Sequence, residues 1–397
     1  MPADVPVETK RKVDRGPMTP ACPVYRGQDD VWQVQDYATA RLVLRSTDTR
    51  QAGFGIENFE RLSNKMRRPV LYRDGPAHRE HRRQTAKYFT PRRVDTKYRE
   101  LMHRLADEQC DRLRKSGRAD LSDLSFALAV AVAAEVIGLD GSPTRMARRL
   151  NRFFTEHDTQ PGWRSPKAIY RMLYDNGTLL SFFLFNVWPS VRARRKQRRD
   201  DLISHLLDEG CTAPEVLGEC VTFGAAGMVT TREFITVAAW HLFTDDDLRA
   251  AYVEGDEPSR YAMLHEILRL EPVVADLFRY ATADIELTGP DGPVTIPAGA
   301  KVDVRIAAAN VDPAAVGDSP TELCPARRVA DGVDDAGLSF GDGPHRCPGA
   351  PIAIQETDIF LTTLFALPGL RMVHEPTVRI RPEIASYELV GLEVTVG

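Results

Sequence analysis

The chain has 397 residues, of which 43% are hydrophobic and 27% are charged, and its formal net charge is −4. This mix is typical of a globular protein and excludes a disordered chain, a collagen-like fibre and a polytopic membrane protein. The small net charge also gives no global basic field of the kind that nucleic-acid binders use. Six scattered cysteines without a C-x-x-C pair are too few for a disulfide scaffold, which favours a reduced, cytoplasmic setting: Cys22, Cys110, Cys211, Cys220, Cys324 and Cys347.

Neither the start of the chain nor its most apolar stretch predicts a membrane segment. The first twenty residues are polar and hold no apolar run, so we expect no signal peptide and no anchor. The stretch 126–134 is interrupted by Glu135 and is far shorter than the roughly 20 residues that span a bilayer. It predicts a buried core helix.

Hydrophobic spacing predicts a mostly helical chain with minor sheets. Residues 31–37 alternate like a strand, and 36–46 have helical spacing, with Ala38, Leu42 and Val43 on one face. Later helices are predicted at 76–139, broken near residues 90–91 and 116–117, at 143–189, from 212 to about 243, at 258–270 and at 348–367, and strands at 278–304 and near the C-terminus. No repeat or linker is evident, so we expect one mainly α domain over residues 1–397.

A basic run lies between the predicted helices at 143–189 and 212–243. Residues 192–199 hold six Lys and Arg side chains. Such a run is most often a solvated surface. The alternatives are a site for an acidic partner and a cluster of internal ion pairs.

The segment 338–356, LSFGDGPHRCPGAPIAIQE, carries the strongest chemical signal. Phe340, Gly341, Gly343, His345, Cys347 and Gly349 form the pattern F-G-x-G-x-H-x-C-x-G. The three glycines allow positive φ and close approach to a bulky group. A helix is expected to begin just after the cysteine, with Pro348 in its first turn, so that its N-terminus favours a thiolate. The pattern predicts a cysteine that ligates a metal from a loop.

This segment resembles the haem-ligand loop of the cytochrome P450 family, and further motifs extend the resemblance over nearly the whole chain. It implies the single-domain fold of the soluble bacterial members, with haem b as the cofactor. The resemblance makes Cys347 the axial thiolate of the haem iron, which favours O–O cleavage. Phe340, Gly341 and Gly349 would line the cofactor.

Two further motifs match that family. In HEILRLEP, Glu266 and Arg269 lie three residues apart on one helix face. They resemble the family's E-x-x-R pair, and LCPAR then supplies its third member, Arg327, in a structural role. In DGPAHREHRR, His78 and Arg82 resemble the pair that binds haem propionates, together with Arg279 and His345.

The predicted long helix carries GAAGMVTTREF, which resembles the family's A/G-G-x-D/E-T-T. Ala226 and Gly227 match the small residues beside the cofactor, and Thr230 matches the oxygen-side threonine, followed by Thr231. The family's acid is missing because Val229 stands in its place. A carboxylate there normally supports proton delivery.

Three explanations of Val229 remain open. Glu233 or ordered water relays protons, the substrate supplies a polar group, or the reaction needs less from this position, as in radical coupling of aromatic rings. Glu233 is otherwise an exposed or ion-paired helix residue.

The resemblance implies a haem-thiolate monooxygenase or oxidase that acts on a small organic molecule, such as a secondary metabolite, by hydroxylation or epoxidation. A non-catalytic haem protein is the alternative of another class. No Rossmann glycine fingerprint or ferredoxin cysteine set is present, so electrons are expected from NAD(P)H through a ferredoxin and its reductase, docking near Arg346. The protein is expected to be a cytoplasmic monomer that binds neither nucleic acid nor membrane. Expected substrate contacts are Val229, Val274, Ala275, Asp276, Leu277, Ser386, Tyr387 and Leu389, while Phe153, Phe154, Phe182 and Phe183 are expected in the core.

Overall fold

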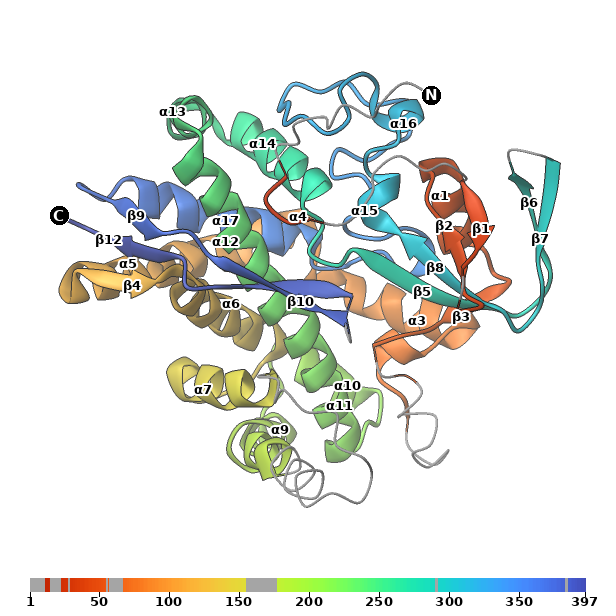
Figure 1. The fold of residues 1–397 in the computed structure, drawn as a ribbon. Helices are drawn as coiled ribbons and strands as arrows, with labels where there is room; N and C mark the ends of the chain where they lie inside the picture. Colours follow the sequence, from red (N-terminus) through yellow and green to blue (C-terminus); the bar gives the residue numbers. More distant parts are fainter. Residues whose placement is uncertain are drawn as a thin grey trace, which may run out of the picture.

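The computed structural model describes residues 11–14, 23–27, 29–54, 56, 67–154, 177–289, 292–382 and 385–397, and for residues 151–154 and 225 the backbone alone. Helices dominate these residues, and the strands form small sheets at the edges of the helical body (Figure 1). The predicted mainly α fold with minor sheets is therefore confirmed. Among the described helices, none is long and apolar enough to cross a membrane.

The helices follow the predicted order. They are α1 (Tyr37–Arg45), α3 (Gly75–Thr85), α4 (Pro91–Arg93), α5 (Arg99–Ser116), α6 (Leu121–Ile137), α7 (Pro143–Phe154), α9 (Trp188–Lys196), α10 (Leu202–Asp208), α11 (Ala213–Gly224), α12 (Thr230–Thr244), α13 (Asp246–Glu254), α14 (Glu257–Leu270), α15 (Ile306–Ala309), α16 (Pro313–Val316) and α17 (Ala350–Phe365). Three π-helical turns join them: η3 (Val94–Tyr98), η4 (Phe183–Val187) and η5 (Ala225–Val229).

The strands form one mixed sheet and smaller antiparallel units. The larger sheet has the order β1 (Val24–Arg26), β2 (Trp32–Val34), β8 (Lys301–Arg305), β5 (Asp276–Ala281) and β3 (Thr49–Gln51). The others are β6 (Ile285–Gly289) with β7 (Gly292–Ile296), β10 (Thr377–Arg381) with β11 (Ser386–Val390), and β4 (Arg118–Asp120) with β12 (Glu393–Thr395) and β9 (Arg371–His374).

One long helical run, α11, η5 and α12, crosses the middle of the molecule (green in Figure 1). It covers residues 213–244, as the spacing predicted. Its central turn, η5, is π-helical, and such turns are frequent at functional sites. The run packs on α6, which is buried on almost every side, as expected for a core helix.

The prediction for the face of α1 is right for Val43, which is buried, and wrong for Ala38 and Leu42. Ala38 and Leu42 are exposed, and Leu42 keeps 49% of its accessible surface. The buried side is formed by Tyr37, Ala40 and Val43 instead. Both triplets satisfy helical spacing, and the packing of α1 on the sheet strand β8 decides between them.

The basic run at 192–199 serves two roles. Arg194 is only 2% exposed and contacts Asp201 at 2.6 Å, Asp140 at 2.5 Å and the carbonyl of Gly138 at 2.9 Å. The other basic side chains of residues 192–199 are exposed at the surface. The internal ion-pair reading therefore holds for Arg194.

Replacing Arg194 by Ala should lower the free energy of unfolding by about 3–5 kcal/mol, because Asp201 is left buried without its guanidinium partner. Urea unfolding followed by circular dichroism measures the change. The matched control is Arg195→Ala, an exposed neighbour whose guanidinium lies 5.9 Å from the Trp188 ring. It should cost less than about 1 kcal/mol. Equal losses in the two variants would contradict the buried ion pair.

Candidate functional site

The loop before α17 presents Cys347 at a helix N-terminus. Gly341 and Gly343 have φ of 67° and 65°, and a Cβ on Gly343 would lie 2.6 Å from the carbonyl oxygen of Leu44. Gly349, in contrast, has an ordinary φ of −83°. The Cys347 amide donates to the carbonyl of Phe340 at 2.7 Å, which closes the loop. The helix begins at Ala350 rather than at Pro348, two residues later than predicted.

Many protein atoms surround Cys347, but its side chain keeps solvent-accessible surface. Burial raises the pKa of its thiol, while the amides of Gly349 and Ala350 and the nearby Arg82 act in the opposite direction. Among the other described cysteines, Cys110 and Cys220 are buried, and burial raises their thiol pKa, that of Cys110 to about 12. The amides of Gly349 and Ala350 and the nearby Arg82 favour the charged form of Cys347, and this combination makes it the candidate thiolate ligand.

Basic side chains gather beside this loop. The rings of His78 and His345 stack with centroids 4.1 Å apart, and His345 Nε2 donates to Asp74 at 2.9 Å. Arg82 donates to the carbonyl of Arg346, next to the cysteine. Burial lowers the pKa of His78 to about 3 and that of Arg279 to about 10. The structure therefore brings the four residues expected at the propionates into one neighbourhood, with Asp74 as the acid among them.

The long helix contributes a turn of small residues. Ala226 is exposed, and a Cβ added to Gly227 would meet no atom within 4 Å. The hydroxyl of Thr230 donates to the Ala226 carbonyl inside the π-helical turn. Val229 and Thr231 are buried. The helix surface here is open at Ala226 and Gly227, as a flat cofactor requires.

Glu266 and Arg269 form a buried, bidentate ion pair in which both N–O distances are 2.7 Å. Arg327 joins Glu266 at 2.9 Å, and the amide of Cys324 donates to the same carboxylate oxygen at 2.9 Å. Arg269 is fully buried and also donates to the carbonyl of Asn310. The sequence motif thus identified three side chains that meet in one network linking α14 to the segment ahead of the cysteine loop.

The alternation of strand β5 separates two expected substrate contacts. Leu277 pairs with Val304 and Arg279 with Val302, on one face of the sheet. Asp276 pairs with Arg305 and points to the opposite face, where its carboxylate lies 2.7 Å from Arg305 Nε. Asp276 therefore lies on the face opposite Leu277, paired with Arg305 and 23% exposed, and is not among the residues that share a face with Leu277.

The hairpin residues expected at the substrate are packed into the core. Ser386, Tyr387 and Leu389 are each at most 1% exposed, and the Tyr387 hydroxyl donates to the Glu271 carbonyl at 3.4 Å. Val274 and Leu277 keep accessible surface, while Ala275 is 5% exposed. Phe182 is buried and Phe183 packs against the core, as predicted; the side chains of Phe153 and Phe154 lie outside the described residues.

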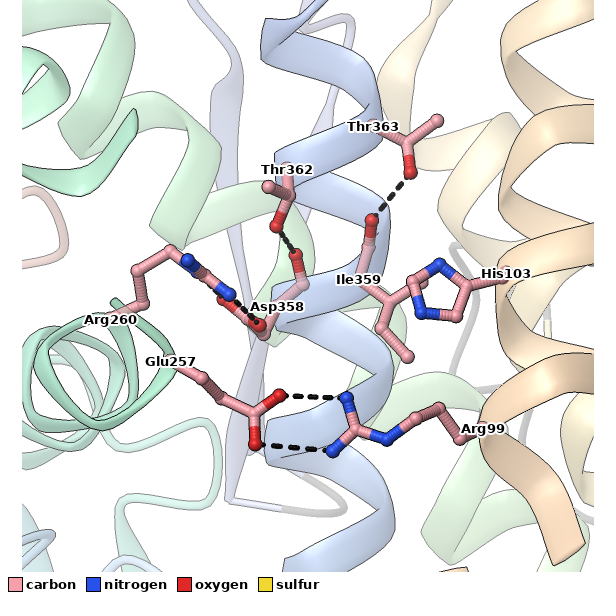
Figure 2. Close-up of a pocket in the computed structure, with 8 residues that line it drawn as sticks. All are labelled: Arg99, His103, Glu257, Arg260, Asp358, Ile359, Thr362 and Thr363. Carbon is pink, nitrogen blue, oxygen red and sulfur yellow. Dashed lines mark hydrogen bonds and ion pairs between the residues drawn. The ribbon is translucent and has the colours of Figure 1, made fainter. Parts of the chain in front are cut away.

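A cavity of about 220 Å³ between α5, α14 and α17 is a separate feature (Figure 2). Its lining is charged but internally neutralised: Arg99 binds Glu257 through two hydrogen bonds, and Arg260 binds Asp358 at 2.7 Å. The hydroxyls of Thr362 and Thr363 donate to carbonyls of their own helix. These two ion pairs join α5 to α14 and α14 to α17.

The comparisons with known proteins agree with the motifs. A family model described as cytochrome P450 matches residues 260–375. The chain is 28% identical to the erythromycin C-12 hydroxylase of Saccharopolyspora erythraea, over 92% of this chain and 89% of that protein. It is 30% identical to the cytochrome P450 monooxygenase PikC of Streptomyces venezuelae, over 85% of this chain and 77% of that protein. The chain belongs to the cytochrome P450 family.

The fold of this cytochrome P450 agrees with solved members. A mutant of P450 EryK in complex with erythromycin B superposes with a TM-score of 0.72 at 25% identity, over 94% of this chain and 93% of that one. The family's cofactor is haem, with electrons from NAD(P)H delivered by redox partners.

The residues present fit a haem. In the described part of the chain no three His, Cys, Asp or Glu side chains gather to hold a bare metal ion, and Cys347 offers a single sulfur ligand, as a porphyrin-bound iron requires. His78 is only 1% exposed, and its Nδ1 atom has no hydrogen-bond partner among the described residues. A carboxylate beside it would satisfy that atom, since a buried polar atom without a partner is costly.

Two residues were not predicted: Asp74 in this cytochrome P450 site, and Arg305 on the face of the sheet opposite Leu277. The Asp74 carboxylate accepts hydrogen bonds from His345 and from the backbone amide of Gln51. Arg305 forms an ion pair with Asp276. Asp74 was visible in the sequence as the first residue of the DGPAH motif, directly before α3. Arg305 carries no local signal, because its pairing depends on the register of β5 and β8.

Glu266→Gln should lower the free energy of unfolding by at least about 3 kcal/mol, because Arg269 and Arg327 lose their shared carboxylate and Arg269 has no access to water. Urea unfolding of the haem-bound enzyme measures it. Glu254→Gln, at an exposed position of α13, is the control and should change the value by at most about 0.5 kcal/mol. A loss no larger than that of the control would contradict the role of the network.

Proposed function

We propose that this enzyme inserts one oxygen atom from O2 into a small organic molecule, by hydroxylation or epoxidation, and that Cys347 would supply the thiolate that binds the haem iron. The observation that carries the proposal is the accessible Cys347 sulfur, held by the amides of Gly349 and Ala350 beside the basic cluster. When bound, the haem supplies the iron that activates dioxygen once two electrons have arrived. We further propose that residues 1–397 form one domain.

The residues of this chain would divide the work as follows. His78, Arg82, Arg279 and His345 would bind the two propionates by charge-assisted hydrogen bonds. Phe340, Gly341 and Gly349 would line the thiolate side, and Ala226 and Gly227 would let the long helix pass close on the other side. Thr230 holds a hydroxyl proton that is bonded to the Ala226 carbonyl, and Thr231 is the buried residue behind it.

Val229 would make proton supply unusual. Its side chain neither donates nor accepts a proton, so the family's helix carboxylate is missing from the position before Thr230. Val229, Val274, Ala275 and Leu277 would then form an apolar wall for the substrate. The apolar wall favours a substrate that brings hydrocarbon to the reactive centre.

The finer partner assignments are also proposals. Arg346, directly before the cysteine, is half exposed and pairs with Asp334, which supports a docking surface for a ferredoxin at this loop. A ferredoxin reductase, a monomeric state and a cytoplasmic location complete the proposal. Radical coupling and a non-catalytic role remain predictions from Val229 and from fold alone, and no contact among the described residues favours either.

Cys347→Ala should abolish the reduced carbon monoxide absorption band that is diagnostic of a thiolate-bound haem. The band requires sulfur ligation, so spectra of the dithionite-reduced enzyme with and without carbon monoxide give the answer. Cys324→Ala is the control, since Cys324 is also accessible but lies outside the loop. Survival of the band in the Cys347 variant would overturn the assignment of the ligand.

Oxygen from labelled O2 should appear in the product. A substrate is first found by its shift of the haem spectrum, using a panel that includes macrolides such as erythromycin B, the ligand named for the EryK structure. Turnover with ferredoxin, reductase and NADPH under ¹⁸O₂ should raise the product mass by one labelled atom. A coupled or cyclised product without label would overturn the insertion chemistry in favour of radical coupling.

A further inference from the structure

The carboxylate of Glu233 joins the long helix to strand β11. Glu233 lies three residues after Thr230 and is fully buried, so the expectation of an exposed residue is wrong and that of an ion pair is confirmed. One carboxylate oxygen accepts from Arg232 Nε at 2.6 Å, and the other accepts from the backbone amide of Leu389 at 2.8 Å. The side chain thus binds its own helix and a strand 156 residues away.

The amide of Leu389 needs this partner. Strand β11 pairs on one side with β10, where Leu389 lies opposite Val378. Its other side has no neighbouring strand over Tyr387–Val390 among the described residues, and Leu389 is fully buried. A buried amide on a strand edge is costly unless something accepts its hydrogen bond. Glu233 takes the place of the missing strand at this point.

Further charges surround the same contact. Arg232 also lies 3.1 Å from Glu388, and Arg381 on β10 binds Glu388 at 2.7 Å. The Arg232 guanidinium lies over the Phe126 ring of α6 at 5.4 Å. The two carboxylates and two guanidiniums therefore form a chain that runs from α12 across β11 to β10.

The start of β11 is attached to the segment after the Glu266–Arg269 helix. Ser386 forms an antiparallel bridge with Val274, and the amide of Ala275 donates to the carbonyl of Ala385 at 2.8 Å. Leu277, two residues after Ala275, lies against Gly341 of the cysteine loop. Strand β11 is therefore fixed at one end through residues 274–275 and at the other through Glu233.

We propose that Glu233 is a specificity-determining positioning residue: by holding the Leu389 amide it fixes β11, and through the Ser386–Val274 bridge it sets where the apolar wall of Val274 and Leu277 lies. This proposal rests on the proposed site of oxidation. Glu233 touches neither haem nor substrate in this scheme. Glu233 lies one helical turn after Val229. The long helix therefore keeps a buried acid, and this acid positions strand β11 instead of supplying protons.

Two variants at position 233 have side chains of nearly equal volume and differ in whether they can accept the hydrogen bond of the Leu389 amide. Glu233→Gln keeps an oxygen that accepts from the Leu389 amide, whereas Glu233→Met fills the same space without an acceptor. The probes are imidazole and 4-phenylimidazole, which bind haem iron and differ in the room that they need. Dissociation constants come from the shift of the haem absorption band in the holoenzyme. Glu254→Met on α13 is the exposed control.

For Glu233→Met we expect the dissociation constant of 4-phenylimidazole to rise about fivefold or more relative to that of imidazole, because the wall that meets the phenyl ring is no longer held. Glu233→Gln and Glu254→Met should leave the ratio within about twofold. An unchanged ratio in Glu233→Met overturns the proposal. If the wild-type enzyme binds neither probe, the proposed function fails instead.

Amide hydrogen exchange gives a second readout that does not depend on ligand. The Leu389 amide should be protected in the wild type and should exchange at least about tenfold faster in Glu233→Met. Should that variant fail to fold, the wild type still decides, because rapid exchange of the Leu389 amide would show that Glu233 does not hold the strand.

Discussion

Buried charge is the constraint on which this structure depends. Glu266 and Arg269 are at most 4% exposed and the Arg327 side chain is 7% exposed, so each of these charges relies on the others as partners. Their network ties α14 to the chain that leads into the cysteine loop, and the Asn310 carbonyl that Arg269 binds belongs to the segment behind that loop. Charge pairing therefore fixes the segment that leads into the cysteine loop, and the turns of the loop itself depend on Gly341 and Gly343.

The same constraint explains why the motifs were informative. E-x-x-R, H-x-x-x-R and the cysteine pattern name residues whose chemistry needs partners at fixed spacing, and the structure brings those partners together. The long helix was also predictable, since an apolar pattern from 212 to 243 has few alternatives to a helix that crosses the molecule.

What the sequence left open was decided by tertiary register. Asp276 and Leu277 are neighbours in the chain, but the pairing of β5 with β8 sends them to opposite faces, and no pattern within residues 276–281 states which face meets the cysteine loop. The face of α1 was missed in part for the same reason, because Ala38, Leu42 and Val43 form as good a stripe as the one that is buried. Tyr387 and Leu389 were placed by analogy of position, and their burial follows from how β11 packs on α12.

Val229 and Glu233 belong to one question about the long helix. Val229 brings no acid to the position before Thr230, and the carboxylate at 233 is buried and bound to Arg232 and to a strand amide. Burial raises the pKa of Glu233 to about 7 against the opposing effect of Arg232. Because both of its oxygens already serve as acceptors, releasing one for proton transfer would cost the Leu389 hydrogen bond. Glu233 thus cannot hold strand β11 and relay protons at the same time, and the observed contacts favour the role of holding β11.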